Sequence, residues 1–316
     1  MNKITHVNAT TIAEASAALG DGAAIIAGGT DILGSLKGMI YPDPPTKLVN
    51  IKNIPGLDYI KEEGGMLKIG ALTKLVTIHE SSVVQSKYPA LSEAAHKVAT
   101  PHLRNMGTIA GNLVQAVRCW YYRSEHVGYN CLRKGGPICY MVPGNSLRNA
   151  ALFGAAGCFA GSPSDCAPVL VALGATIVTN QRSIPIADMY AALANTLAKN
   201  EIITEIQVPT PAAGTKQAYM KWAWRKSIDF PEVGVAAFLT ISGGNVTDAR
   251  IVMSGLSPVP YRSTAAENAI KGGALDVTRA TAAGTAATQG STPLANNKWK
   301  VQMTKTIVKR TLLSLA

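Results

Sequence analysis

The first hundred residues alternate between apolar and polar segments that predict short helices and strands. An alanine-rich segment over 11–19 predicts a helix, which Gly20 and Gly22 would end. The apolar run 23–27 predicts a strand, which leads through a glycine turn into another helix extending to Met39. Further strands are expected over 47–51 and 66–70, and a helical stretch with polar interruptions over 78–97.

The second half of the chain carries longer strand-like runs. Residues 169–173 form a continuous apolar run, and residues 175–179 have the composition of a strand. The proline- and glycine-rich stretch 209–214 predicts a linker. Beyond it we expect strands over 234–242 and 249–254, joined by a Gly-Gly-Asn hairpin turn, and then an alanine-rich, helix-prone part.

The length of 316 residues is enough for about two domains of roughly 150 residues each, with a sizeable buried core. The N-terminal sequence MNKITHVNATTIAEAS has no apolar run typical of a signal peptide, so we expect a cytoplasmic protein whose thiols stay reduced. No stretch approaches the roughly 20 uninterrupted apolar residues of a membrane span, so no span is expected. The hydrophobic content of 47% indicates extensive buried surface, part of it expected at a subunit interface.

The formal net charge of +11 raises the question of nucleic-acid binding. The basic residues are scattered, and their densest group lies in a C-terminal segment in which Ile307, Leu312 and Leu313 have helical spacing. This group consists of Lys298, Lys300, Lys305, Lys309 and Arg310. We therefore expect no nucleic-acid partner, but a solvated helix face or a docking surface for an acidic partner.

Four of the five cysteines lie within one forty-residue stretch. They are Cys119, Cys131, Cys139 and Cys158, and the fifth is Cys166. Reduced thiols in such a cluster are more often metal ligands or catalytic groups than disulfides. Their separations of twelve, eight and nineteen residues include no CxxC pair, which disfavours the common zinc ribbons and fingers. An iron–sulfur cluster, a structural zinc site and unliganded buried thiols remain as alternatives.

Two glycine-containing segments have features of nucleotide-binding loops. Residues 27–31, Ala-Gly-Gly-Thr-Asp, join a predicted strand to a predicted helix, and their glycines let backbone N–H groups face a pyrophosphate. They lack the spacing of a Rossmann fingerprint and of a P-loop. Residues 100–112 combine a proline, two glycines, two asparagines and hydroxyl side chains. Each segment alone is also compatible with an ordinary turn or surface loop.

Five sequence blocks together span nearly the whole chain: AGGTDILGSLK at 27–37, TPHLRNMGTIAGN at 100–112, GSPSDCAPVLVALGA at 161–175, RKSIDFPEVGVAA at 225–237 and the closing KWKVQMTKTIVKRTLLSL. In this order they resemble the FAD-binding medium subunit of molybdenum hydroxylases, which include carbon monoxide and xanthine dehydrogenases. The resemblance implies an α+β protein with a two-subdomain FAD-binding fold (PCMH/vanillyl-alcohol-oxidase-like) and a C-terminal small antiparallel sheet with helices. The expected bounds are 1–60, 61–212 and 213–316.

By this resemblance, FAD lies between the two N-terminal subdomains. The backbone of the 28–31 turn and the hydroxyl of Thr30 would hold the pyrophosphate, residues of the 100–112 loop would line the flavin, and Asp165 matches a family Asp that contacts the cofactor. The expected cofactor-binding residues are Ala27, Gly28, Gly29, Thr30, Asp31, Ile32, Thr100, Asn105, Thr108, Gly111, Asn112, Asp165, Lys226 and Asp229.

Three positions complicate this assignment. Ala110 stands where the family usually has glycine, which adds a methyl group at a close-packed turn. Arg225 and Asp229 match the family pattern, but an Arg–Asp ion pair is an equally good explanation of them.

Residues 113–161 separate the two flavin loops, which the ordinary family pattern joins almost directly. A loop this long in a compact domain is uncommon unless it is functional or disordered, and its aromatic content argues against disorder. RCWYYR at 118–123, YNCLRKGGPICYM at 129–141 and GCFAGSPSD at 157–165 resemble the inserted segments of the 4-hydroxybenzoyl-CoA reductase branch, which bind a 4Fe-4S cluster. On that match the ligands are Cys119, Cys131, Cys139 and Cys158, and Cys166 is the spare cysteine.

The resemblance implies an electron-transfer subunit of a molybdopterin-dependent complex. Its expected partners are a molybdopterin-binding large subunit and a 2Fe-2S small subunit in a dimer of heterotrimers, with NAD or ferredoxin as electron partner. No set of residues for acid–base or nucleophilic catalysis stands out, so the chemistry belongs to the cofactors. The alternatives are a self-sufficient flavin oxidoreductase with its own small substrate and a zinc-stabilised binding module.

Overall fold

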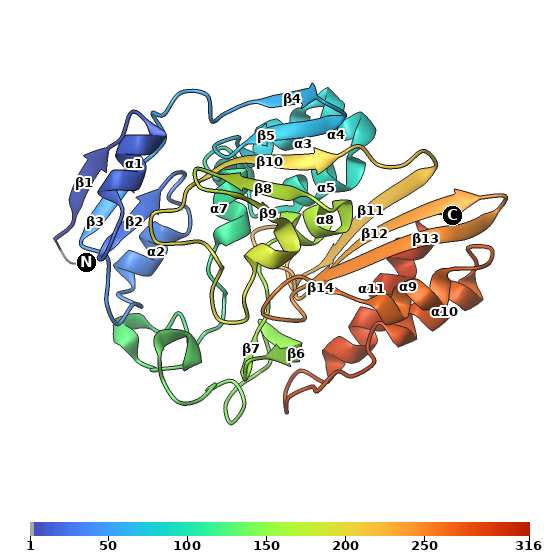
Figure 1. Cartoon of the computed structure of the whole chain (residues 1–316). Helices are drawn as coiled ribbons and strands as arrows, with labels where there is room; N and C mark the ends of the chain where they lie inside the picture. The colour runs from blue at the N-terminus through green and yellow to red at the C-terminus, as the bar shows by residue number, and fades with distance from the viewer. Residues whose placement is uncertain (1–2) are drawn as a thin grey trace.

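The computed structural model describes residues 3–316 and places the chain around three main β-sheets (Figure 1). The N-terminal sheet has the strand order β1-β3-β2, and both pairings are parallel. Its elements are β1 (Thr5–Asn8), α1 (Ile12–Ala18), β2 (Ala23–Ile26), α2 (Ile32–Lys37) and β3 (Lys47–Asn50). They confirm the alternation of strands and helices that the N-terminal sequence predicts.

The second sheet has five strands in the order β4-β5-β10-β8-β9, and all its pairings are antiparallel. These strands are β4 (Ile60–Glu63), β5 (Met66–Gly70), β8 (Thr176–Thr179), β9 (Ser183–Pro185) and β10 (Ile203–Pro209), and the short 3-10 helix η3 (Ile186–Met189) follows β9. Two short helices, α6 (Pro101–Arg104) and α7 (Ile109–Val114), precede the cysteine-rich segment. None of the helices over residues 3–316 is long and apolar enough to cross a membrane.

The segment 78–97, for which the sequence predicts a helical stretch with polar interruptions, belongs to three short helices. They are α3 (Leu75–Glu80), α4 (Ser82–Lys87) and α5 (Pro89–Lys97). Ser81 ends the first helix in an extended conformation and caps the second by accepting a hydrogen bond from the N–H of Val84. Pro89 lacks an N–H donor and therefore suits the first position of a new helix better than the interior of a long one.

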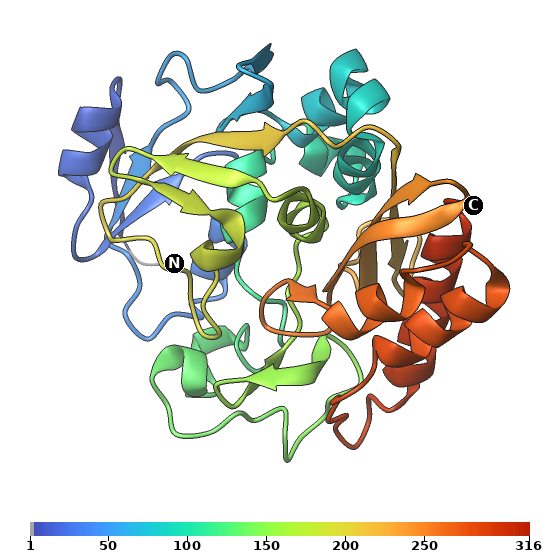
Figure 2. The same ribbon diagram turned by 45° about the vertical axis from the view of Figure 1, so that its right-hand side comes forward.

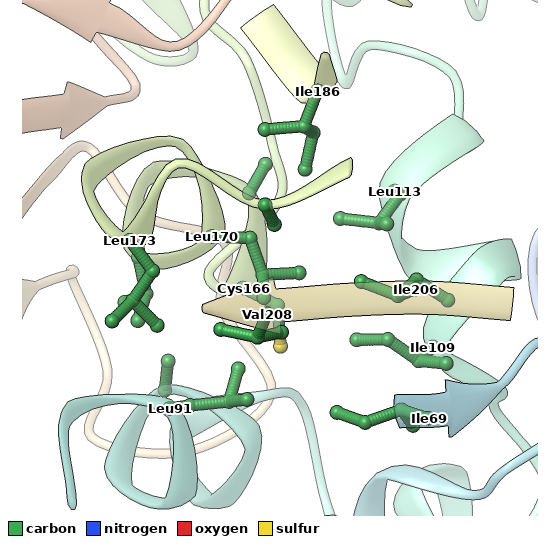
Figure 3. Packing of buried hydrophobic residues seen from close by; sticks show 14 of the residues in the cluster. Ile69, Leu91, Ile109, Leu113, Cys166, Leu170, Leu173, Ile186, Ile206 and Val208 are labelled. Atoms are coloured by element: carbon green, nitrogen blue, oxygen red, sulfur yellow. The ribbon is translucent and has the colours of Figure 1, made fainter. Parts of the chain in front are cut away.

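The apolar run 169–173 belongs to helix α8 (Cys166–Leu173), which lies inside the main core. Figure 3 shows Cys166, Leu170 and Leu173 of this helix packed among apolar side chains of β5, α5, α7 and β10. A helix that is buried on nearly all sides has no polar face, so its sequence cannot be distinguished from a buried strand by periodicity. Figure 3 also places the sulfur of Cys166 in this apolar core.

The C-terminal part confirms the predicted antiparallel sheet with helices. Its strands, in the order β11-β12-β13-β14, are β11 (Thr215–Trp222), β12 (Val233–Ser242), β13 (Asn245–Ser254) and β14 (Tyr261–Arg262). Gly243 and Gly244 both have positive φ values, as the predicted hairpin turn between β12 and β13 requires. The helices α9 (Thr264–Ile270), α10 (Val277–Ala286) and α11 (Trp299–Leu313) pack beside this sheet (Figures 1 and 2).

Lys300 corrects the expectation of a solvated basic face on the C-terminal helix. Its side chain is fully buried, and its ammonium group lies 2.9 Å from a carboxylate oxygen of Glu232. It also donates to the carbonyl oxygens of Ala150 and Gly255. This lysine is therefore part of the interior and joins three segments of the chain.

The cysteine-rich segment is ordered and forms a unit at the lower edge of the molecule in both views (green in Figures 1 and 2). It contains two 3-10 turns, η1 (Glu125–Val127) and η2 (Leu132–Lys134), and the strands β6 (Ala150–Ala155) and β7 (Cys158–Ala160). The rings of Tyr121, Tyr129 and Tyr140 lie within 6.2 Å of one another, centroid to centroid. Trp120, in contrast, is 55% exposed, whereas the neighbouring Cys119 is buried.

Candidate flavin cavity and cysteine cavity

A largely apolar cavity of about 330 Å³ lies where the N-terminal sheet meets the second sheet. Its walls come from residues 27–32, residues 107–112 and the start of the cysteine-rich segment, with Phe230 from the loop after β11. Of the expected cofactor-binding residues, nine line it: Ala27, Gly28, Gly29, Thr30, Asp31, Ile32, Thr108, Gly111 and Asn112. A concave, mostly apolar site with a few polar groups is typical of a cofactor pocket.

The two glycine loops touch directly at Gly28. A Cβ atom at this position would lie 2.0 Å from the carbonyl oxygen of Met106, closer than any real contact allows. Gly29 has a φ of +72°, a conformation that side chains rarely adopt. Both glycines are therefore required by the backbone, and they leave the main chain of this turn open toward the cavity.

Asp31 is engaged by two arginines of the cysteine-rich segment. Its Oδ1 lies 2.7 Å from Arg118 and 2.5 Å from Arg123, and its Oδ2 accepts a hydrogen bond from the N–H of Ala116. Burial alone would raise the pKa of this carboxyl group, but the two guanidinium groups hold it below the usual value. The carboxylate thus ties the flavin loop to residues on both sides of Cys119.

The second loop is organised by hydrogen bonds within the protein. The Thr108 hydroxyl accepts from the N–H of Gly111 and so caps α7. The buried Asn112 side chain accepts from the hydroxyl of Ser164, which precedes α8. Ala110 lies within α7 and lines the cavity, so its additional methyl group is accommodated there.

Five expected residues do not line this cavity: Thr100, Asn105, Asp165, Lys226 and Asp229. Thr100 caps α6, and Asn105 ends it. Asp165 is buried, accepts from the hydroxyl of Tyr219 at 2.6 Å and pairs with Lys221 at 3.0 Å. Asp229 forms an ion pair with Arg225, as the structural explanation of this pair predicts.

Several cavity residues were missed from the sequence. Gln115, Ala116 and Arg118 come from the start of the inserted segment, and Tyr41 and Phe230 come from loops far away in the sequence. No motif marks these positions. Only the adjacency of Arg118 to Cys119 could have drawn attention to it.

The four clustered cysteines surround a second, much smaller cavity. Cys119, Cys131, Cys139 and Cys158 all line it, together with Tyr121, Tyr122, Leu132, Arg133, Tyr140, Met141 and Ala160. All five cysteines of the chain are free thiols. Cys166 does not line this cavity and belongs to the main apolar core. Within residues 3–316, no three Cys, His, Asp or Glu side chains form a group that could hold a metal ion.

Two basic side chains, Arg133 and Lys134, lie at or near the thiol cavity. Arg133 donates from Nε to the sulfur of Cys158 at 3.4 Å, and the N–H of Ala160 donates to the same sulfur. The ammonium group of Lys134 is buried and has no hydrogen-bond partner among residues 3–316. A hydrogen bond from Cys139, together with the charge of Arg133, lowers the pKa of Cys158, whereas burial raises that of Cys119 to about 11.

The comparisons with known proteins agree along the whole chain. The model of the FAD-binding domain in molybdopterin dehydrogenase matches residues 2–211, and that of the C-terminal domain of carbon monoxide dehydrogenase flavoproteins matches residues 218–315. The FAD-binding subunit of an aldehyde oxidoreductase from Escherichia coli strain K12 is 33% identical over 329 residues, covering 100% of this chain and 98% of the relative.

Carbon monoxide dehydrogenase of Hydrogenophaga pseudoflava is similar in both sequence and structure. Its medium chain is 29% identical over 303 residues, covering 93% of this chain and 89% of the relative. A solved structure of that enzyme matches with a TM-score of 0.79 at 27% identity, over 99% of this chain and 97% of the other. The chain therefore belongs to the FAD-binding medium subunits of the molybdenum hydroxylases, the family of the carbon monoxide and xanthine dehydrogenases, and is an oxidoreductase flavoprotein subunit.

Proposed function

We propose that this chain carries one FAD and one 4Fe-4S cluster, and that it relays electrons between partner subunits and an external carrier. The observation that carries the proposal is the position of four free cysteines around one cavity, in a segment that also forms part of the flavin pocket wall. FAD would supply the step between two-electron and one-electron transfer, and the cluster would supply a one-electron centre.

The flavin site fits its cofactor through the backbone. The glycine turn at 28–31 presents main-chain groups to the cavity, and the absence of a side chain at Gly28 lets the two loops approach each other closely at Met106. Apolar residues such as Ile25, Leu72 and Leu75 form much of the remaining wall. We assign the pyrophosphate to the first loop and the flavin to the second.

The donor set and the charge of the cysteine cavity support an iron–sulfur cluster. No three side chains of residues 3–316 are grouped around a single metal ion, but a 4Fe-4S cluster needs only one thiolate at each of its four irons. Four thiolates around an iron–sulfur core form an anionic group. Arg133 and Lys134 are the cations that such a group would stabilise. The buried ammonium of Lys134 has no hydrogen-bond partner among residues 3–316 and lies 5.7 Å from the centroid of the Tyr122 ring, so a nearby anion would lower the cost of its burial. The proposed ligands are Cys119, Cys131, Cys139 and Cys158.

The partner subunits follow from the family. We propose that a molybdopterin-binding large subunit and a 2Fe-2S small subunit join this chain, in a dimer of heterotrimers. The two cofactors assigned to this chain would then form the outer part of the relay. A ferredoxin-type carrier is the preferred external partner, because a one-electron cluster near the surface suits a one-electron donor or acceptor, and NAD is the second candidate.

Two cysteine variants test the cluster assignment. Cys139→Ser removes one of the four proposed thiolates, so anaerobically purified protein should lose most of its iron while it retains FAD. Cys166→Ser is the matched control, because this thiol is buried in the apolar core away from the cavity. We expect it to lower stability by about 1–3 kcal/mol and to leave the iron content unchanged. Equal iron content in wild type and Cys139→Ser would contradict the assignment.

A further inference from the structure

Arg118 and Arg123 both bind Asp31, but Arg118 has one guanidinium donor without a hydrogen-bond partner in the described part of the chain. Its side chain is 15% exposed and lines the flavin cavity, and the centre of its guanidinium group lies 4.1 Å from the centroid of the Phe230 ring. One of its terminal nitrogens pairs with Asp31, and the other donates to the side chain of Gln115 at 2.8 Å. Its Nε is buried and has no hydrogen-bond partner among residues 3–316.

Arg123, in contrast, has a hydrogen-bond partner for each of its three guanidinium nitrogens. It binds Asp31, donates to the carbonyl oxygens of Val117 and Ala116, and donates to the hydroxyl of Ser35. It does not line the cavity. Contacts within the protein therefore explain all the guanidinium nitrogens of Arg123, whereas the Nε donor of Arg118 has no partner within the described residues.

The charges around the cavity do not balance. Among the described residues that line it, the charged ones are Asp31, Glu201 and Arg118. Glu201 pairs with Arg182 and is thereby neutralised. Asp31 is shared between two arginines, which leaves one positive charge in excess at the end of the cavity beside the glycine turn. An anionic ligand there would balance this charge and accept the free Nε donor.

We propose that Arg118 is a cofactor-binding residue that holds the diphosphate of FAD. The inference rests on the proposed flavin site. It commits to the diphosphate because Arg118 is anchored on Asp31, the last residue of the turn that faces the pyrophosphate, and because guanidinium groups bind phosphate oxygens in fixed geometry. The inserted cysteine-rich segment thus completes the flavin site as well as supplying thiols.

The test compares ligands that contain different parts of the cofactor. The flavin-depleted full-length chain is titrated with FAD, ADP and riboflavin, and binding is measured by calorimetry. Arg118→Gln should lower the affinities for FAD and ADP by a similar factor, on the order of tenfold, because one charge-assisted hydrogen bond is lost. Riboflavin has no phosphate, so its affinity should not change. Arg118→Lys keeps the charge but loses the paired N–H donors of the guanidinium group. Its affinities for FAD and ADP should lie between those of wild type and of Arg118→Gln.

Arg148→Gln is the matched control. Arg148 lies in the same inserted segment and also stacks on an aromatic ring, that of Trp224 at 4.8 Å, but it does not line the cavity. Its removal should leave all three affinities unchanged.

The outcomes separate the inference from the proposed function. Wild-type protein that binds no FAD would contradict the proposed function itself. If wild type binds FAD and both Arg118 variants bind FAD and ADP equally well, the inference is wrong. A loss of riboflavin affinity without a loss of ADP affinity would place Arg118 at the isoalloxazine ring and also overturn it. Circular dichroism of each variant shows whether a loss of binding reflects unfolding, and Arg118→Lys keeps the test decisive if Arg118→Gln does not fold.

Discussion

Gly28 is the residue at which the flavin cavity depends most on the absence of a side chain. Gly28→Ala places a methyl group 2.0 Å from the carbonyl oxygen of Met106, so one of the two loops must move. We expect FAD content to fall severalfold and the free energy of unfolding to fall by about 1–3 kcal/mol, as in overpacked cores. Flavin absorbance per chain and urea unfolding measure the two effects.

Gly34→Ala is the control for this substitution. Gly34 lies on the exposed side of α2, a few residues further along, and a Cβ there would meet no atom within 4 Å. Alanine in a helix is favoured over glycine by about 0.5–1 kcal/mol, so this variant should keep its FAD and not lose stability. Full FAD content in Gly28→Ala would contradict the role given to this contact.

At the scale of single residues, the sequence predicts cavity residues that belong to a recognisable motif. It misses those that come close to the cavity only when the chain has folded. The 27–32 turn and Thr108, Gly111 and Asn112, which the sequence predicts as cofactor-binding residues, line the cavity. Phe230 and Arg118 were not predicted, because they reach it from segments about 110 positions apart in the sequence. Asp165, also expected at the cofactor, does not line the cavity, and its carboxylate binds Tyr219 and Lys221.

At the scale of elements, the buried ion pair of Lys300 and Glu232 joins α11 to the loop before β12 and, through Ala150, to the start of β6. Lys300→Met would leave the Glu232 carboxylate buried without its cation. We expect a loss of about 3–5 kcal/mol in the free energy of unfolding, measured by urea denaturation. Lys298→Met, on the exposed end of the same helix, should change it by less than about 0.5 kcal/mol. Equal stability of the two variants would contradict the role assigned to the pair.

Elements with one exposed face were easier to predict than elements without one. The strands β2 and β3 and the hairpin between β12 and β13 lie where apolar runs and glycine turns placed them. Helix α8 lacks a polar face, so its apolar run did not distinguish helix from strand. The interruptions expected within 78–97 lie at Ser81, which caps α4, and at Tyr88, which is followed by Pro89 at the start of α5.

At the scale of the whole molecule, the inserted segment lies between two sites. Arg118 and Arg123 reach Asp31 of the flavin loop, and Cys119 between them lines the thiol cavity. In the opposite direction, the segment ends in β6 and β7, and Ala150 accepts a hydrogen bond from Lys300 of the C-terminal part. The proposed cluster would thus be held by a segment that contacts both the flavin loop and the C-terminal sheet domain.

The most direct test of this account is the cofactor content of the wild-type chain. Protein purified without oxygen is analysed for iron, acid-labile sulfide and flavin, and its visible and EPR spectra are recorded. We predict about four iron atoms, about four sulfides and about one FAD per chain, with the EPR signal of a reduced 4Fe-4S cluster. Protein that contains FAD but no iron, or zinc in place of iron, would contradict the central claim that one chain carries both centres.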